Sequence, residues 1–181
     1  MNKQIGEKSD ELWDLYDRDR NLTGRTHRRG DPLGEDEYHL VVHVCIFNDK
    51  GELLIQKRQP WKTGWPDMWD LSVGGSATVG DDSRRAAQRE ALEELGVKLD
   101  LSHEYPKFTI NFDGGFDDYW IITRNIELSE LSLQYEEVAD AKWVSREELS
   151  DMAEKGEFIP YYFLSMLFDL KYTEGAIKFN S

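Results

Sequence analysis

Short runs in which apolar and polar positions alternate recur along the chain, and this period-two pattern predicts half-buried β-strands. The runs cover residues 12–16, 39–48, 52–58, 69–73, 108–112, 119–123 and 141–144. Turn-forming segments predict three hairpins. They are residues 17–24, which lead into Arg25-Thr26-His27, then Asp49-Lys50-Gly51, then Asp113-Gly114-Gly115.

Three helices are predicted beside these strands. The clearest spans residues 83–95, with Asp82 as its N-cap and Gly96 in the C′ position. The second opens at Ser145 with a capping box to Glu148 and ends near residue 156. The third follows Pro160, where apolar residues recur at helical spacing: Tyr161, Leu164, Leu167 and Phe168. Together these elements predict an α+β fold, a mixed β-sheet flanked by helices.

Composition indicates one soluble domain over residues 1–181. With 39% hydrophobic residues the chain can form one sizeable core, and no repeat or linker divides it. The first dozen residues show no apolar leader, and no run approaches the roughly 18 apolar residues of a membrane span. We therefore expect no membrane partner. Cys45, the one cysteine, lies in an apolar run, which suits a buried side chain in a reducing cytoplasm.

The net charge of −14 argues against nucleic-acid polymers as partners, because such binding depends on Lys and Arg that neutralise phosphates. A small phosphate-bearing molecule is still a suitable ligand if a cation accompanies it. A homodimer is left open as the assembly.

Three acids of the clearest helix, Glu90, Glu93 and Glu94, fall in one arc at about 100° per residue. An apolar arc lies beside them, formed by Ala87, Ala91, Leu92 and Leu95. Like charges four residues apart destabilise a helix by roughly 0.2–0.5 kcal/mol, and no basic residue lies three or four positions from Glu90. Mg²⁺, which prefers hard oxygen ligands, would compensate; a solvated acidic face is the alternative.

A longer pattern surrounds these acids: Gly75, five residues, Asp81, seven residues, then Arg89-Glu90-Ala91-Leu92-Glu93-Glu94-Leu95-Gly96-Val97. It closely resembles the Nudix box, Gly-x5-Glu-x7-Arg-Glu-U-x-Glu-Glu-x-Gly-U with U apolar, and only Asp81 departs from a fixed position. A match this long is far more specific than a lone three-glycine motif. The resemblance therefore favours a cation site over a solvated face.

The resemblance implies a Nudix-like α/β/α sandwich with the box at residues 75–97 and an N-terminal β-hairpin extension at about residues 10–37. It implies that Glu90, Glu93 and Glu94 hold Mg²⁺, with Mn²⁺ as the other candidate. The backbone at Gly74 and Gly75 can approach the ion closely, so that a carbonyl of Gly74 adds a ligand.

Four further box positions are implied to be structural: Gly75, Asp81, Arg89 and Gly96. Arg89 would anchor the loop by pairing with the first acid of the box. Because aspartate is one methylene shorter than the usual glutamate, the reach of the Asp81–Arg89 pair is a point for the structure to decide.

The implied activity is hydrolysis of a diphosphate linkage in a nucleoside diphosphate derivative or related small molecule, with Glu93 and Glu94 counted among the catalytic residues. The metal would neutralise the diphosphate and lower the pKa of the attacking water. The family places the general base outside the box. Two acidic pairs are candidates, Asp117/Asp118 and Glu136/Glu137, with Asp118 and Glu137 preferred; an ordinary surface acid is the alternative for each.

Cations outside the box could bind the substrate's phosphates. Arg29, Lys57 and Arg58 are the candidates, and surface solvation is the alternative interpretation. Trp61 and Trp65, in the loop before the box, could stack on a base.

Three longer segments resemble the isopentenyl-diphosphate isomerase branch of Nudix folds: DLYDRDRNLTGRTHRRG, YHLVVHVCIFNDKGELLIQKR and WPDMWDLSVGG. That isomerase uses a catalytic cysteine and a histidine-rich metal site. The resemblance puts Gly74 at the cysteine and Ser76 at a metal histidine, while His27 and His39 match its other metal histidines. Without a thiol, proton transfer to an alkene lacks its acid, so isomerase activity is the runner-up. A ligand-sensing Nudix module without catalysis is a further alternative.

Overall fold

The computed structural model describes residues 10–171 and residue 173. The first nine residues, on which the expected lack of a leader partly rests, lie outside the described residues, as do the ends of the predicted 1–181 domain. Within the described part, no helix is both long and apolar enough to traverse a lipid bilayer.

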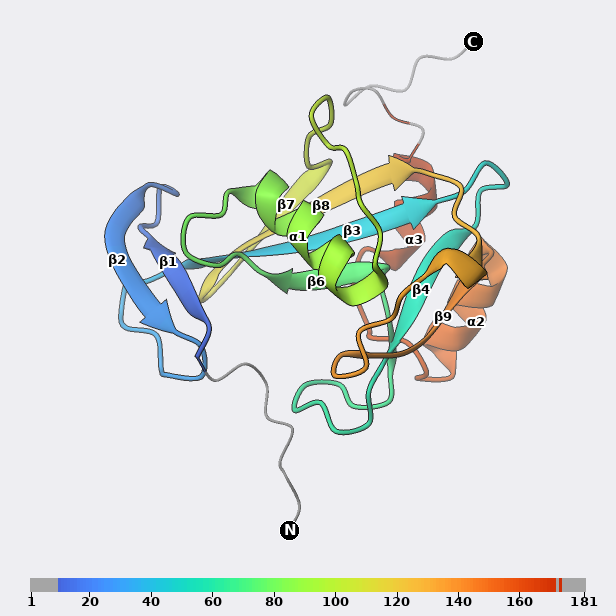
Figure 1. Ribbon diagram of the computed structural model, residues 1–181, viewed down its shortest axis with the longest axis horizontal. Coiled ribbons are helices and arrows are strands. Elements are labelled where there is room, and N and C mark those ends of the chain that lie inside the picture. Colours follow the sequence, from blue (N-terminus) through green and yellow to red (C-terminus); the bar gives the residue numbers. More distant parts are fainter. Residues whose placement is uncertain (1–9, 172, 174–181) are drawn as a thin grey trace.

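The described chain forms the predicted mixed sheet flanked by helices (Figure 1). In order, its elements are β1 (Leu12–Tyr16), β2 (Leu22–Arg28), β3 (His39–Phe47), β4 (Leu53–Arg58), β5 (Trp69–Asp70), β6 (Val73–Ser76), α1 (Ser83–Leu95), β7 (Phe108–Phe112), β8 (Gly115–Thr123), the 3₁₀-helix η1 (Leu128–Glu130), β9 (Val138–Val144), α2 (Arg146–Glu154) and α3 (Leu164–Leu170).

Strand β3 is the centre of the main sheet. It pairs in parallel with β8 and antiparallel with β6, while β8 continues to β7. Strand β4 pairs with β5 and β9, and it meets β3 only at the pair Phe47–Leu53, next to their connecting turn. The predicted hairpin of these two strands is therefore present, but its arms diverge, as Figure 1 shows.

The side chain of Ser72 bridges the diverging strands. Its hydroxyl accepts a hydrogen bond from the Ile46 amide at 2.9 Å and donates to the Leu54 carbonyl at 2.5 Å. This explains why the single strand predicted over residues 69–73 was wrong: the segment splits into β5 and β6 around a residue that bonds through its side chain.

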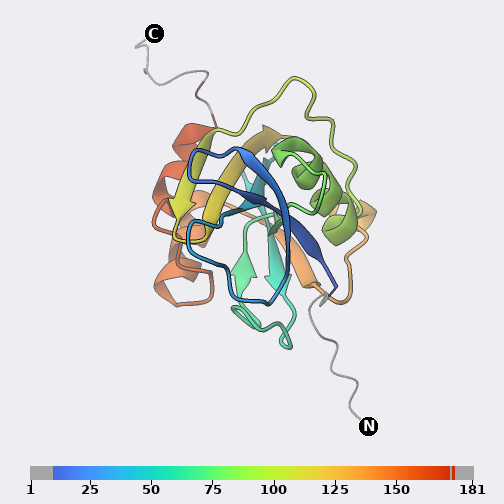
Figure 2. The ribbon, with the colours of Figure 1, turned by 90° about the vertical axis from the view of Figure 1, so that its left-hand side faces the viewer.

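Helix α1 covers one face of the sheet, and α2 and α3 cover the other (Figure 2). Alternate residues of β3 enter the two cores: Val42 and Val44 pack on the α1 side, while Cys45 and Phe47 pack on the α2–α3 side. Cys45 is fully buried, as expected.

Other boundaries differ from those predicted. Strand β2 begins at residue 22, because the Asp17 carboxylate accepts from the Asp19 and Asn21 amides and so tightens the turn. Strands β8 and β9 begin earlier than expected, since pairing with β3 and β4 extends them. Helix α3 begins only at Leu164, and Leu92, assigned to the apolar arc, is exposed.

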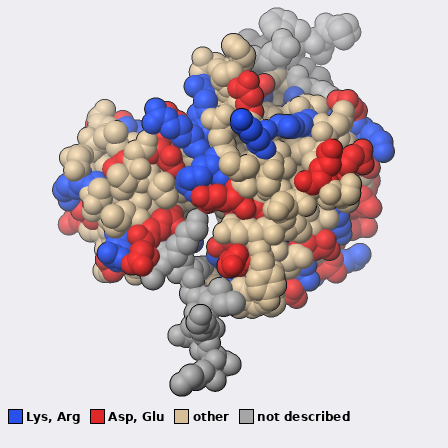
Figure 3. Space-filling model, viewed as in Figure 1, with Lys and Arg blue, Asp and Glu red and all other residues tan. Residues whose placement is uncertain are grey.

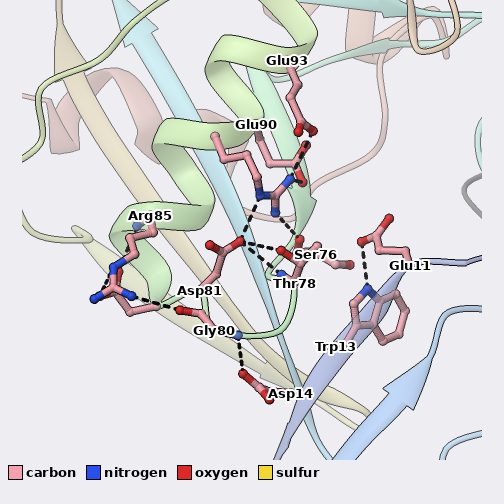
Figure 4. Close-up of polar contacts among 12 residues, drawn as sticks. Glu11, Trp13, Asp14, Ser76, Thr78, Gly80, Asp81, Arg85, Glu90 and Glu93 are labelled. Atoms are coloured by element: carbon pink, nitrogen blue, oxygen red, sulfur yellow. Dashed lines mark hydrogen bonds and ion pairs between the residues drawn. The ribbon is translucent and has the colours of Figure 1, made fainter.

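The β1–β2 hairpin forms its own two-stranded sheet and rests against the loop before α1. The Val79 amide donates to the Leu12 carbonyl at 3.0 Å, and the Gly80 amide donates to Asp14 Oδ2 at 2.7 Å (Figure 4). The Trp13 ring stacks on His39, with centroids 4.2 Å apart. The hairpin is therefore packed onto the first loop of the box.

Candidate metal centre and active site

The helix that carries the acids is bounded as its sequence predicts. The Asp82 side chain accepts from the Arg85 amide at 2.9 Å, and Gly96 ends the helix with a left-handed φ of 71°. A Cβ at Gly96 would lie 2.7 Å from the Ser132 side chain, so conformation and packing both require glycine. These caps fix where the helix begins and ends.

Glu90 and Glu94 lie on the buried arc, with exposed fractions of 7% and 5%. Glu94 Oε2 accepts from Gln56 Nε2 at 3.0 Å and from the Gly74 amide at 3.2 Å. Burial, followed by the charge of Glu90, nevertheless raises the pKa of the Glu94 carboxyl well above its usual value. Two buried carboxylates that disfavour each other's charge form a site where a cation would be stabilising.

Arg89 ties the box together, and its partners Asp81, Glu90 and Ser76 are labelled in Figure 4. Its guanidinium pairs with Asp81 at 2.9 Å and Glu90 at 2.7 Å, donates to the Ser76 carbonyl at 2.9 Å, and reaches Glu93 at 3.2 Å. The shorter Asp81 therefore does reach its partner. No basic residue lies three or four positions from Glu90, but the long side chain of the adjacent Arg89 folds back and pairs with it.

The two glycines of β6 leave room for other side chains. A Cβ at Gly75 would lie 2.3 Å from the carboxyl carbon of Glu90, and a Cβ at Gly74 would lie 2.7 Å from the His43 ring. The His43 ring is held by Asp117 at 2.8 Å. Burial alone would lower the pKa of His43, but the Asp117 carboxylate raises it. The position aligned with the isomerase cysteine is therefore closed by a fixed ring.

A pocket opens beside the two buried glutamates. Its lining comprises Glu11, Arg29, Arg58, Lys62, Gly74, Gly75, Glu90, Glu94, Gln134 and Glu137. The predicted residues Arg29, Arg58, Glu137, Glu90, Glu94 and both glycines are thus brought together from the hairpin, β4, β6, α1 and the segment before β9.

Each cation of this pocket already has an acidic partner. Arg29 pairs with Glu11 at 3.0 Å, and Lys62 pairs with Glu137 at 2.5 Å. Arg58 lies 3.5 Å from Asp70 and donates to the Gly64 carbonyl at 3.0 Å. Lys and Arg are correspondingly interspersed with Asp and Glu on the face shown in Figure 3.

Two predicted site residues lie elsewhere. Lys57, next to Arg58 along β4, pairs with Asp67 at 2.7 Å and does not line the pocket, because successive strand residues point to opposite faces. Asp118 is 1% exposed; it receives hydrogen bonds from Arg20 and, at 2.6 Å, from Thr109. Its carboxylate therefore has partners outside the pocket, whereas Glu137, the other preferred candidate for the base, lines the pocket.

Four residues in or next to the pocket were not predicted from the sequence. Glu11, Lys62 and Gln134 line the pocket, and Gln56 contacts Glu94. None lies at a fixed spacing from the box, and their meeting depends on long-range packing of separate segments. The sequence offers one hint for this group: Lys62 lies close to Arg58, in a loop rich in tryptophan.

The described residues contain no ready-made cluster of three His, Cys, Asp or Glu side chains for a metal ion. Glu93, predicted as a ligand, lies 3.2 Å from the Arg89 guanidinium, which also pairs with Glu90. His27 Nε2 lies 3.0 Å from the Asp31 carbonyl, and His39 stacks on Trp13. Burial, with the charges of His27 and Arg29, lowers the pKa of His39 to about 4. Both histidines thus make ordinary polar or ring contacts with neighbouring residues.

The fold and the box together define a Nudix domain, and a family model described as NUDIX domain matches residues 37–166. A protein named as an uncharacterized Nudix hydrolase of Listeria monocytogenes is 58% identical over 161 residues, which cover 89% of this chain and 95% of that protein. The chain therefore belongs to the Nudix hydrolase family, and it is a Nudix pyrophosphohydrolase.

Two further matches, both weaker, concern the fold and the isomerase-related branch of the family. A crystal structure from Deinococcus radiodurans shares the fold with a TM-score of 0.71, at 24% identity and over 90% of this chain and 100% of that one. An isopentenyl-diphosphate Delta-isomerase of Salmonella heidelberg is 32% identical over 113 residues, 58% of this chain and 61% of the isomerase. This weaker similarity fits the isomerase-related branch, without its catalytic cysteine.

Proposed function

We propose that this chain is a Mg²⁺-dependent hydrolase that cleaves a diphosphate linkage in a nucleoside diphosphate derivative or a related small molecule, with Mn²⁺ as an alternative ion. The observation that carries the proposal is the meeting of buried Glu90 and Glu94 with three acid-paired cations in one pocket. Carboxylates suit a hard cation, and Lys and Arg suit phosphate.

The donor set fits magnesium. Glu90 and Glu94 supply buried carboxylates, Glu93 supplies a more exposed one, and the Gly74 carbonyl is the candidate backbone ligand. Gly75 leaves the space that the Glu90 carboxylate occupies. When bound, the ion would neutralise the diphosphate and lower the pKa of the attacking water.

The cations of the pocket would bind the diphosphate. Arg29, Arg58 and Lys62 pair with carboxylates, and phosphate oxygens would replace those carboxylates as partners. When Lys62 shifts to phosphate, Glu137 is released to accept a proton from water. Glu137 is accordingly the proposed general base.

An aromatic pair supports a nucleoside as part of the substrate. Trp61 and Tyr135 are 39% and 64% exposed, and their ring centroids lie 5.2 Å apart. Each is the chain neighbour of a pocket residue, Lys62 or Gln134. Exposed aromatic faces at the edge of a phosphate pocket suit a planar base.

The hairpin and the family domain would act as one unit, since Glu11 and Arg29 line the same pocket as the box. We therefore propose that the hairpin and the matched region form a single domain. The homodimer and the cytoplasmic location stay predictions.

The test is phosphate release from nucleoside diphosphates and triphosphates, nucleotide sugars and dinucleotides, with and without Mg²⁺. We expect turnover of at least one compound with Mg²⁺ and none with excess chelator. Full turnover in chelator would contradict the metal role. Tight binding of a compound without any turnover would favour a ligand-sensing module.

A further inference from the structure

Gln56 is a buried amide that the Nudix box does not include. It lies on β4 with an exposed fraction of 3%, and its backbone pairs with Asp70 on one side and Ala141 on the other. Its side chain reaches Glu94 on α1. It therefore contacts one of the two proposed metal-binding carboxylates directly.

The chemistry of that contact fixes the orientation of the amide. Nε2 donates to Glu94 Oε2 at 3.0 Å, whereas the opposite orientation would place an amide oxygen against a carboxylate oxygen. The amide oxygen Oε1 consequently cannot face that carboxylate oxygen. In the described structure this oxygen is buried without a hydrogen-bond partner.

A second glutamine shares this property. Gln134 lines the pocket, and within the described residues its side-chain oxygen is also buried without a hydrogen-bond partner. Its backbone amide donates to the Glu94 carbonyl at 2.9 Å, so it lies beside the same helix end. A buried acceptor without a donor destabilises the fold, and one such oxygen on the pocket lining with a second on a residue that contacts Glu94 indicates that donors enter with a ligand.

Gln59 shows the contrasting arrangement. Its amide nitrogen donates to the carbonyls of Tyr135 at 2.8 Å and Val138 at 3.2 Å, and it ties two loops together. Its oxygen is not among the buried acceptors that lack a partner in the described chain. This glutamine, which ties two loops together through its nitrogen, therefore does not share the condition of Gln56 and Gln134.

A hydrated divalent cation supplies the missing donors. Mg²⁺ usually keeps several waters, whose hydrogens point away from the ion toward surrounding acceptors. We propose that Gln56 is a positioning residue of the metal site: its nitrogen holds the Glu94 carboxylate, and its oxygen accepts a hydrogen bond from water that accompanies the cation. This inference rests on the proposed function, because it needs a cation at Glu90 and Glu94.

The test compares Gln56→Met with the matched control Gln88→Met. Methionine keeps the length of the side chain and removes both polar atoms. Gln88 lies on α1, where its amide donates to the Leu99 carbonyl at 2.9 Å, and it does not line the pocket. Mn²⁺ binding is measured by electron paramagnetic resonance on the full chain, and the melting temperature is measured without metal.

Gln56→Met should weaken Mn²⁺ binding by about tenfold or more, the usual effect of losing a group that orients a metal's ligands. Its metal-free melting temperature should be unchanged or higher, because the unsatisfied oxygen is removed together with the bond to Glu94. Gln88→Met should show the reverse: a lower melting temperature and unchanged Mn²⁺ affinity. Opposite signs in the two measurements separate a metal-positioning role from a structural one.

Equal Mn²⁺ affinity in wild type and Gln56→Met would overturn the role of Gln56 and leave the proposed function standing. Absence of Mn²⁺ binding by the wild type would overturn both. If Gln56→Met does not fold without metal, Gln56→Leu is measured in its place. Failure of both variants to fold would refute the proposal, since the amide would then be needed in the absence of any cation.

Discussion

The substitution Glu94→Gln tests the metal centre most directly. The amide has almost the same shape as the carboxyl group, and its oxygen can still accept from Gln56 and the Gly74 amide, which both donate to one carboxylate oxygen. What is lost is one negative charge beside Glu90. Turnover of the best substrate with Mg²⁺ should fall at least a hundredfold, about 2.7 kcal/mol at roughly 1.4 kcal/mol per tenfold.

The same substitution should stabilise the metal-free protein. A buried ion without full compensation costs up to several kcal/mol, and Glu94 keeps two hydrogen bonds, so we expect a gain of about 1–3 kcal/mol. For a chain of this size each kcal/mol raises the melting temperature by about 2–4 °C, which gives a rise of roughly 2–12 °C. Loss of activity with gain of stability distinguishes a ligand from a structural acid.

The pH dependence has a defined sign. The folded-state pKa of Glu94 lies above its usual value of 4.5, so ionisation costs stability as pH rises from 4.5 toward the folded pKa. The difference in melting temperature between Glu94→Gln and wild type should therefore vanish near pH 4.5 and grow as the pH rises above that value. Glu147→Gln, an exposed residue at the start of α2, is the control and should be nearly silent. Near-normal turnover by Glu94→Gln would refute the metal assignment on α1.

Three further results are expected. Gly75→Ala should displace the Glu90 carboxylate, because its Cβ would lie 2.3 Å from the carboxyl carbon, and should lower turnover at least tenfold; normal kinetics would show that Glu90 tolerates the shift. The folded-state pKa of His39 is lowered to about 4, so as the pH falls below 6.5 the unfolded chain binds a proton at this residue before the folded chain does. The free energy of unfolding, measured by chemical denaturation, should therefore fall by up to about 3 kcal/mol between pH 7 and 4. His39→Phe, which keeps a ring on Trp13, should lack that loss, and an equal loss in the variant would contradict this cause. Isopentenyl diphosphate should give no dimethylallyl product by mass spectrometry, since Gly74 lacks a thiol and His43 fills the space above it.

Local signals predicted the box helix fully. Asp82 and Gly96 act on the backbone within one turn of themselves, so its ends could be assigned without knowing the tertiary structure. The spacing of Glu90 and Glu94 likewise predicted that they share an arc. Their burial beside Gln56 could not be predicted, because it depends on a strand that precedes them by more than thirty residues.

The errors also have a common physical origin. The predicted strand at residues 69–73 failed because Ser72 replaces a ladder bond with its hydroxyl, which alternation of apolar residues does not reveal. The contacts of Asp118, a candidate base, could not be predicted either, because Arg20, which donates to it, lies almost a hundred residues earlier. Both features depend on contacts between distant parts of the sequence.

The β1–β2 hairpin lies outside the residues that the family model matches, yet its Arg29 and Glu11 form part of the pocket wall. If Arg29 binds phosphate as proposed, the residues that hold the metal and those that contact the substrate come from separate stretches of the sequence. Substitutions at Glu11 or Arg29 would then alter substrate binding while the glutamates of α1 stay as they are. Such an arrangement would let substrate binding change during evolution without changes in the box.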